Sequence, residues 1–230
     1  MTNTPASRED SLATLRESRL WDVLIIGGGA SGLGAAVDAA ARGYRTLLVE
    51  ARDFASGTSS CSTKLIHGGV RYLRQGDVGM VRNALHERTY LLNNAAHLVH
   101  PLAFIIPAWH TVDRIMYAAG LTLYDLLSGG HALEASRSLN RQEVITALPG
   151  LHRAGLCGGI RYWDGQFDDA RLAITLMRTA TDLGAICLNY LRVTRLLKCA
   201  ERITGAVLRD TESSEEFEVS ARAIINATGV

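Results

Sequence analysis

The sequence lacks the features that would indicate disulfides, a metal site or a nucleic-acid surface. Its 230 residues include only four cysteines, which lie far apart and form no Cys-x-x-Cys pair. A disulfide framework and a structural metal site are therefore both disfavoured, and a reducing compartment is expected. The net charge is only +1, so no basic surface of the kind that binds nucleic acid is expected.

Long apolar runs are also lacking. The best candidate, "PLAFIIPAW", is interrupted by Pro101 and Pro107 and is far shorter than the roughly 18–20 residues that span a bilayer. The first twenty residues are polar and of mixed charge, without the apolar segment of a signal peptide. We interpret residues 1–20 as a surface helix, and we expect a cytoplasmic protein that could contact a membrane only peripherally.

What the sequence does contain begins with a strand, a turn, a helix and a second strand. Residues 22–26 form a short apolar run that ends in glycines, residues 30–42 carry apolar side chains at helical spacing, and "RTLLVE" ends in Glu50. This βαβ unit predicts an α/β fold with a parallel sheet. We place one domain over residues 21–230, with a mostly helical insertion at residues 76–149.

Further elements follow the same kinds of pattern. Residues 77–96, "TVDRIMYAAGLTLYDLL" and a segment capped by Asp168 predict helices, whereas "PLAFIIP" and "LCGGIRYW" predict strands. "RITGAVLRD" and "EEFEVS" predict a β-hairpin, because the polar "TESS" separates them. "ARAIIN" is expected to form another apolar strand.

Three glycines in the first turn have the Gly-x-Gly-x-x-Gly spacing of dinucleotide-binding proteins. Gly27 permits the tight turn, Gly29 lets the backbone approach a pyrophosphate, and Gly32 allows close packing of the helix. The N–H groups at the start of that helix attract phosphate. Glu50 can accept hydrogen bonds from a ribose, and it disfavours a 2′-phosphate. The alternative is a βαβ unit that binds no ligand.

The glycines alone do not distinguish NAD from FAD, but two other segments favour FAD. The stretch "TSSCSTKLIHGGVRYL" follows the second strand. In flavin enzymes of this architecture the segment after that strand runs beneath the flavin. In addition, "INATGV" places small residues at the end of a strand, where they would allow close approach to the same dinucleotide. A serine-rich turn that caps itself and an ordinary strand end are the alternatives. The predicted cofactor-binding residues are Gly27, Gly28, Gly29, Ala30, Ser31, Gly32, Glu50, Ala51, Thr58, Ser59, Ser62, Lys64, Leu65, His67, Ala227, Thr228 and Gly229.

With "DVLIIGGGASGLGAAVDAAARGYRTLLVEARDFASGTSS", the stretch "GTSSCSTKLIHGGVRYL" resembles the N-terminal half of FAD-dependent, quinone-linked glycerol-3-phosphate dehydrogenases. The likeness continues through "HPLAFIIPAW", "LTLYDLLSG", "YWDGQFDDARL" and "INATG". It implies a glutathione-reductase-type, Rossmann-like FAD domain with a β-hairpin and a substrate cap, incomplete at its C-terminal end. Cys61 departs from the family pattern, and we interpret it as a small buried apolar residue.

The resemblance implies that sn-glycerol 3-phosphate is oxidised to dihydroxyacetone phosphate, with a hydride passing from C2 to the flavin and electrons then passing to a quinone. It places Arg71 and Tyr72 in the substrate pocket, where a guanidinium suits the phosphate, although a loop arginine can equally be a solvated charge. His67 is a candidate acceptor for the C2 hydroxyl proton, and packing against the flavin is its alternative role. Lys64 would support negative charge on the reduced flavin or the pyrophosphate; its alternative is a surface lysine.

Chains of that family are longer than this one, so we expect this chain by itself to retain flavin weakly or not at all and to turn over little. Two other functions stay open. Another FAD-dependent amine or hydroxy-acid oxidoreductase would share the nucleotide fingerprint but would not be expected to carry "KLIHGGVRY". A non-catalytic flavin-binding fragment is the second. No metal ligand set is predicted, and the oligomeric state is left open.

Overall fold

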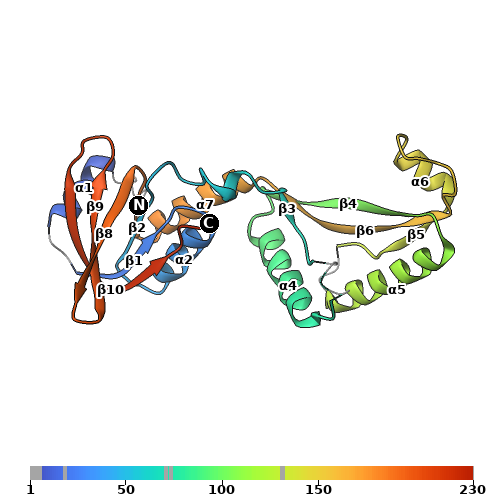
Figure 1. Cartoon of the computed structure of the whole chain (residues 1–230), viewed down its shortest axis with the longest axis horizontal. Coiled ribbons are helices and arrows are strands. Elements are labelled where there is room, and N and C mark those ends of the chain that lie inside the picture. Colours follow the sequence, from blue (N-terminus) through green and yellow to red (C-terminus); the bar gives the residue numbers. More distant parts are fainter. Residues whose placement is uncertain (1–6, 18–19, 70–71, 73–74, 130–132, 230) are drawn as a thin grey trace. The chain divides into compact units, whose positions relative to one another are not determined.

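The computed structural model of the chain describes residues 7–17, 20–69, 72, 75–129 and 133–229. The chain divides into two compact units (Figure 1). The first unit combines Met1–Ser62 with Asp169–Val230, and the second unit is Thr63–Asp168. The insertion predicted at residues 76–149 lies inside the second unit. This unit includes more residues than the predicted insertion, because residues 65–66 before it and 158–167 after it form strands of the same sheet.

The first unit is built on a six-stranded sheet with the order β7–β2–β1–β10–β9–β8. β7, β2, β1 and β10 pair in parallel, as the βαβ pattern predicts, whereas β10, β9 and β8 pair antiparallel. The elements of this unit are α1 (Arg8–Arg16), β1 (Leu20–Ile26), α2 (Ala30–Ala41), β2 (Thr46–Val49), the 3₁₀ turn η1 (Thr58–Ser60), α7 (Asp169–Asp182), β7 (Ile186–Leu188), β8 (Leu191–Cys199), β9 (Arg202–Asp210) and β10 (Glu216–Asn226).

Strand β10 corrects the sequence analysis, which predicted a hairpin strand and a separate apolar strand here. The structure has one continuous strand of 11 residues. Its first half pairs with β9 up to the pair Ser220 and Gly205, and its second half pairs with β1, where Ile224 faces Leu24. The polar residues in the middle of the strand suggested a break, but they alternate with buried Phe217 and Val219.

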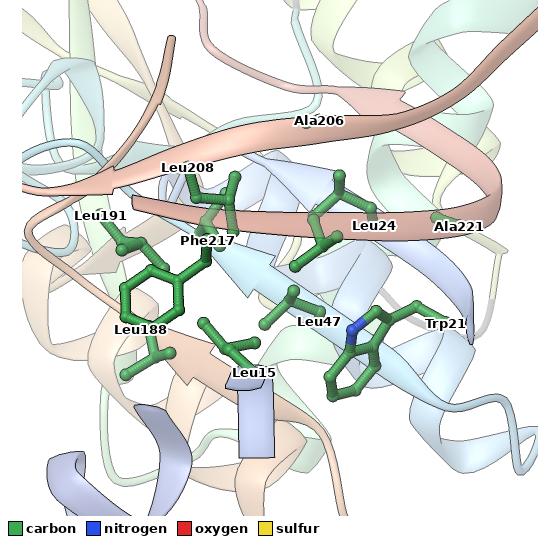
Figure 2. Close-up of a cluster of buried hydrophobic side chains, with 12 residues drawn as sticks. Leu15, Trp21, Leu24, Leu47, Leu188, Leu191, Ala206, Leu208, Phe217 and Ala221 are labelled. Atoms are coloured by element: carbon green, nitrogen blue, oxygen red, sulfur yellow. The ribbon is translucent and has the colours of Figure 1, made fainter. Parts of the chain in front are cut away.

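Both faces of this sheet are covered. On one face, α2 and α7 pack through small and apolar side chains, including Leu33 and Ala180, against Ile25 and Leu48 of the sheet. The opposite face contributes Leu24 and Leu47 to a second cluster (Figure 2). A parallel sheet that is apolar on both faces requires such cover, because its strands have no polar side to expose.

Part of the segment predicted as a helix over residues 1–20 forms α1, at Arg8–Arg16, whereas Leu20 already belongs to β1. One side of α1 is buried. It begins with a capping box between Ser7 and Asp10. Leu15 is only 4% exposed and lies in the cluster that contains Trp21 (Figure 2). The Arg8 guanidinium donates to the Asp210 carboxylate at 3.0 Å, so the helix is fastened to the end of β9.

The second unit has an antiparallel sheet with the order β3–β6–β4, and β5 also pairs with β6. Helices α4 and α5 pack on this sheet, with Leu85 of α4 and Leu121 of α5 against Ile160 of β6. The unit contains β3 (Leu65–Ile66), α4 (Val78–Asn94), β4 (Val99–Ala108), α5 (Thr111–Leu127), β5 (Arg137–Leu139), α6 (Arg141–Ala147) and β6 (Gly158–Phe167).

Candidate functional site

The glycine turn between β1 and α2 is tight enough to require glycine at two positions. Gly27 has φ +117°, and its N–H donates to the Val49 carbonyl at 2.8 Å. A Cβ atom at Gly27 would collide with the Ala227 carbonyl, and one at Gly32 would collide with the Gly27 carbonyl. Close approach of three backbone segments therefore brings the ends of β1, β2 and β10 together at the start of α2.

Glu50 spans the space between this turn and the end of β2. Its Oε2 atom accepts from the Gly28 N–H at 2.7 Å, and its Oε1 atom accepts from the Arg52 N–H at 2.8 Å. A carboxylate oxygen can accept more than one hydrogen bond. The two N–H groups therefore orient the carboxylate and leave each oxygen able to accept again, for example from the hydroxyl groups of a sugar.

The start of α2 meets η1. Gly29 caps this helix in an extended conformation without a side-chain hydrogen bond, and the Ala30 N–H donates to Ser59 Oγ at 2.9 Å. The Ser59 hydroxyl accepts this bond, so its own hydrogen can donate to another group. The first N–H groups of a helix have no carbonyl partner within the helix and attract negative charge. An anion placed here would meet the helix start and a serine donor together.

These groups surround a cavity of about 380 Å³ in the first unit. A second cavity of about 370 Å³ shares Glu50, Arg52 and Thr228 with it and continues along Arg192 and Val193 of β8. The first cavity is lined by Gly29, Ala30, Ser31, Glu50, Arg52, Ala55, Ser56, Gly57, Thr58, Ser59, Ala227, Thr228 and Gly229.

Most of the residues predicted to bind a cofactor in the first unit line these cavities. Ala51 lines the second cavity, while Gly28 and Gly32 shape the turn. The sequence analysis missed Arg52 and the contribution of Arg192 and Val193. Arg52 lies two residues after Glu50 in the loop that follows β2. Arg192 and Val193 reach the same place because the Leu191 N–H at the start of β8 donates to the Glu50 carbonyl at 2.8 Å, a contact between distant residues that no local pattern in the sequence reports.

Ser62 is placed differently from the residues around the cavity. Its hydroxyl donates to the Asp169 carboxylate at 2.7 Å, and its N–H donates to the same oxygen at 3.0 Å. Asp169 is the first residue of α7 and is buried. Ser62 thus anchors the segment that follows η1 to α7, and its predicted donation to a cofactor stays a prediction.

The other predicted residues lie in the second unit, in or next to β3. Lys64 is exposed, has φ +58°, and its carbonyl accepts the Phe167 N–H at 3.0 Å. Leu65 pairs with Gln166 of β6. The roles proposed for Lys64 and Leu65 toward a cofactor stay predictions.

The three residues predicted to be catalytic follow β3. Arg71 lies outside the described residues. His67 is exposed, and its Nδ1 atom accepts the Gly69 N–H at 3.1 Å. Tyr72 packs against the apolar cluster of the second unit, and its N–H donates to the Gly69 carbonyl at 2.7 Å. His67 and Tyr72 therefore both contact the backbone of the same glycine.

A buried charged cluster lies next to this loop and was not predicted. Arg88 of α4 donates to Asp164 Oδ1 of β6 at 2.8 Å, and Tyr124 of α5 donates to Asp164 Oδ2 at 3.0 Å. Burial raises the pKa of Tyr124, and the negative charge of Asp164 raises it further. We refer to Arg88, Tyr124 and Asp164 as the Asp164 cluster.

Cys61 corrects another interpretation. The sequence analysis treated it as a small buried apolar residue, but its side chain is exposed. It follows η1 directly, and its Sγ atom lies 3.7 Å from the Ser60 hydroxyl. The turn directs this side chain to solvent, so burial does not explain the cysteine.

Two features are absent from the described residues. None of their helices is both long and apolar enough to cross a membrane. No group of three or more His, Cys, Asp or Glu side chains among them is placed to hold a metal ion.

Comparison with known families gives a match over nearly the whole chain. Residues 22–230 match the family described as FAD dependent oxidoreductase. The chain belongs to this family. It is 45% identical to the mitochondrial glycerol-3-phosphate dehydrogenase of Rattus norvegicus, over 98% of this chain and 33% of that protein. It is 46% identical to the glycerol-3-phosphate dehydrogenase of Mycobacterium leprae, over 91% of this chain and 36% of that protein.

Solved structures agree with this relationship. The glycerol-3-phosphate dehydrogenase of Bacillus halodurans, solved in complex with FAD, has a TM-score of 0.74 and 32% identity, over 96% of this chain and 36% of that chain. The glycine oxidase of Bacillus cereus has a TM-score of 0.63 at 21% identity, which shows a shared fold alone. The chain spans about a third of the length of the curated relatives it matches.

Proposed function

We propose that this chain forms the FAD-binding region and part of the substrate pocket of a quinone-linked sn-glycerol-3-phosphate dehydrogenase. The observation that carries the proposal is the pair of cavities near the start of α2 that share Glu50, Arg52 and Thr228 in their linings. The similarity to glycerol-3-phosphate dehydrogenases, one of them solved with FAD, supports both the cofactor and the substrate.

The residues of the first unit fit the parts of FAD. The N–H groups at the start of α2 and the Ser59 hydroxyl would bind the diphosphate. The Glu50 carboxylate, oriented by Gly28 and Arg52, would accept the hydroxyl groups of the adenosine ribose. The cavity that continues from Glu50 toward Val193 offers room for the attached base.

Bound FAD would supply the acceptor for a hydride from C2 of sn-glycerol 3-phosphate, and a quinone would take the two electrons onward. The C2 hydroxyl proton must leave as the ketone of dihydroxyacetone phosphate forms. His67 is proposed to act at that hydroxyl or to pack against the flavin. Arg71 and Tyr72 are proposed to bind the phosphate, and Lys64 is proposed to support negative charge at the cofactor.

A quinone acceptor is a lipid-soluble molecule, so the proposal includes peripheral contact with the cytoplasmic membrane. The absence of a candidate spanning helix among the described residues is compatible with such contact. Fractionation of cells that produce the chain, with and without a high-salt wash, measures it. Recovery of all the protein with the cytosol before the wash would contradict membrane contact.

The cofactor part of the proposal is tested by titrating the chain with FAD and following flavin fluorescence. We expect weak but measurable binding. Glu50→Gln should raise the dissociation constant about 10- to 100-fold, because the amide presents an N–H group where Gly28 or Arg52 also donates. Glu218→Gln makes the same charge change on an exposed residue of β10 and should leave binding unchanged. Equal effects of the two variants would contradict the assignment of Glu50.

The reaction is tested by joining residues 1–229 to the remaining part of the Bacillus halodurans enzyme and measuring dye reduction. We expect reduction with sn-glycerol 3-phosphate, little with its enantiomer, and much less from the 230-residue chain alone. A His67→Asn variant that loses far more turnover than flavin would favour action at the C2 hydroxyl, and one that loses flavin as well would favour packing against the flavin. Preferential oxidation of glycine or a hydroxy acid would replace the proposed substrate, and flavin binding without any turnover would favour a non-catalytic role.

A further inference from the structure

The backbone of the loop that carries His67 is held by the Asp164 cluster. The buried Gly68 N–H donates to Tyr124 Oη at 2.9 Å and approaches Asp164 Oδ1 at 3.3 Å. A Cβ atom at Gly68 would collide with the Tyr124 hydroxyl and would lie 2.8 Å from Leu85 Cγ. Helices α4 and α5 therefore hold Gly68 through both a hydrogen bond and close packing.

The composition of the cluster favours a positioning role over a stabilising one. Arg88 is 1% exposed and Asp164 is 2% exposed, and removing two charges from water costs much of what their attraction returns. In addition, Arg88 Nε is buried and has no hydrogen-bond partner. What the cluster does provide is a fixed hydrogen-bond acceptor for Gly68. Arg88 and Tyr124 each donate to one carboxylate oxygen of Asp164, and the Tyr124 hydroxyl oxygen, held by its bond to Asp164, accepts the Gly68 N–H.

The next residue in the loop fixes the chemistry of the His67 ring. Because the Gly69 N–H donates to His67 Nδ1 at 3.1 Å, Nδ1 must be the unprotonated nitrogen of the neutral ring. The hydrogen then resides on Nε2. A ring in this state offers a donor at Nε2, and it can accept a proton only at Nδ1, where the Gly69 bond would have to break.

We propose that the Asp164 cluster is a positioning device that, through Gly68 and Gly69, holds His67 as the Nε2–H tautomer, so that His67 presents a hydrogen-bond donor to its ligand. The presence of a flavin or substrate acceptor atom opposite Nε2 rests on the proposed function. The tautomer and its dependence on the cluster do not. Between the two roles left open for His67, this geometry favours a residue that contacts the ligand over one that takes the substrate proton.

The first test measures the tautomer in the 230-residue chain without FAD. The chain is labelled with ¹⁵N-histidine, and the His67 signals are identified by their loss in His67→Asn. Long-range ¹H–¹⁵N spectra of the neutral ring are expected to show Nε2 protonated and Nδ1 unprotonated. A protonated Nδ1 in the unmodified chain would overturn the proposal, and this measurement needs no variant of the cluster.

The second test removes the hydroxyl that holds Gly68. Tyr124→Phe should speed exchange of the Gly68 amide hydrogen by about tenfold or more, the loss expected for one hydrogen bond, and should give a mixture of His67 tautomers. Tyr162→Phe is the matched control: Tyr162 packs in the same apolar cluster, edge-on to Tyr124, and should leave exchange and tautomer unchanged. Equal effects of both variants, or none in Tyr124→Phe, would refute the role of the cluster.

A third measurement separates this proposal from the proposed function. FAD alone and sn-glycerol 3-phosphate alone are added to the labelled chain. A shift of the Nε2 signal with FAD assigns the acceptor to the flavin, and a shift with the phosphate ester assigns it to the substrate. Absence of a shift with either compound would refute the proposed contact between His67 and a ligand. If the joined enzyme then fails to oxidise glycerol 3-phosphate while the tautomer and exchange results hold, the proposed function fails and the positioning role stands.

Discussion

At the scale of single residues, two glycines of α2 have opposite surroundings although they lie two positions apart. A Cβ atom at Gly32 would collide with the Gly27 carbonyl, whereas at Gly34 no atom lies within 4 Å of it. The helix itself therefore does not require glycine. The requirement at Gly32 comes from the turn that crosses in front of the helix.

This contrast predicts opposite effects of one substitution. Gly32→Ala should lower the free energy of unfolding by about 1–3 kcal/mol, because the turn must shift to admit the methyl group. Gly34→Ala should raise it by about 0.5–1 kcal/mol, because alanine restricts the unfolded chain without a clash. Urea unfolding followed by circular dichroism measures both. Two variants of equal stability would show that the turn adapts freely.

At the scale of elements, α1 is held to the end of β9 by a partly buried ion pair. Burial by itself would raise the pKa of Asp210, but the N–H groups of Glu212 and Ser213 and the Arg8 guanidinium together lower it below its usual range. Arg8 also donates to the Asn189 carbonyl at 2.7 Å. The helix is therefore joined both to β9 and to the segment after β7.

The lowered pKa makes this attachment dependent on pH. A carboxyl group with a lowered pKa in the folded state adds stability above its unfolded pKa of about 3.9, and this stability is lost as pH falls through the folded value. Arg8→Ala should lower the free energy of unfolding by about 1–2 kcal/mol at pH 7, and its difference from the unmodified chain should shrink below about pH 4. Arg42→Ala breaks an exposed pair with Asp38 and should change little at either pH. A difference for Arg8→Ala that does not depend on pH would exclude Asp210 as its cause.

Local patterns predicted those elements whose signals are contained within their own residues. The helix predicted over "TVDRIMYAAGLTLYDLL" is α5 with the same bounds, and the strand–turn–helix around Gly27 was predicted because backbone geometry there dictates the residue type. The two-residue strand β3 has no period to detect. The continuity of β10 was missed because it depends on pairing with β9 and β1, which the sequence does not report.

The distinction between local patterns and long-range packing also explains which residues of the candidate site could be predicted from the sequence. Residues of the glycine turn and Glu50 belong to one short motif, so their meeting could be predicted. Arg88 and Asp164 are separated by 76 positions, and a lone arginine in a helical pattern is ordinarily a solvated charge. Only the packing of α4 against β6 brings these two residues together.

At the scale of the whole molecule, the second unit exposes an apolar side of α5. Val112 and Leu126 are each 75% exposed, and Ile115 and Met116 lie between them on the same side of the helix and are also exposed. Single exposed apolar residues are ordinary, but a continuous group of them is uncommon on a soluble surface. The opposite side of α5 carries Leu121, which is buried.

Polar substitution on the exposed side should therefore cost no stability. A Val112→Gln, Leu126→Gln double variant should keep the free energy of unfolding within about 0.5 kcal/mol and lower the fluorescence of an added apolar dye. Leu121→Ala should instead destabilise the chain by about 2–5 kcal/mol. Thermal unfolding and dye fluorescence, recorded on the same samples, measure both effects. A large loss of stability in the double variant would mean that the apolar side is packed.

The double pairing of β10 has a consequence for synthesis on the ribosome. β1 emerges early and can pair with β2 on one edge, but its other edge has to wait until residues 216–226 have been made, because these residues are its partner. A nascent chain arrested before that point would carry an unpaired edge with apolar Leu24 and Ile25. Such an edge can recruit a strand from another chain, so translational pausing just before β10 would expose the polypeptide to aggregation and make it a client for chaperones.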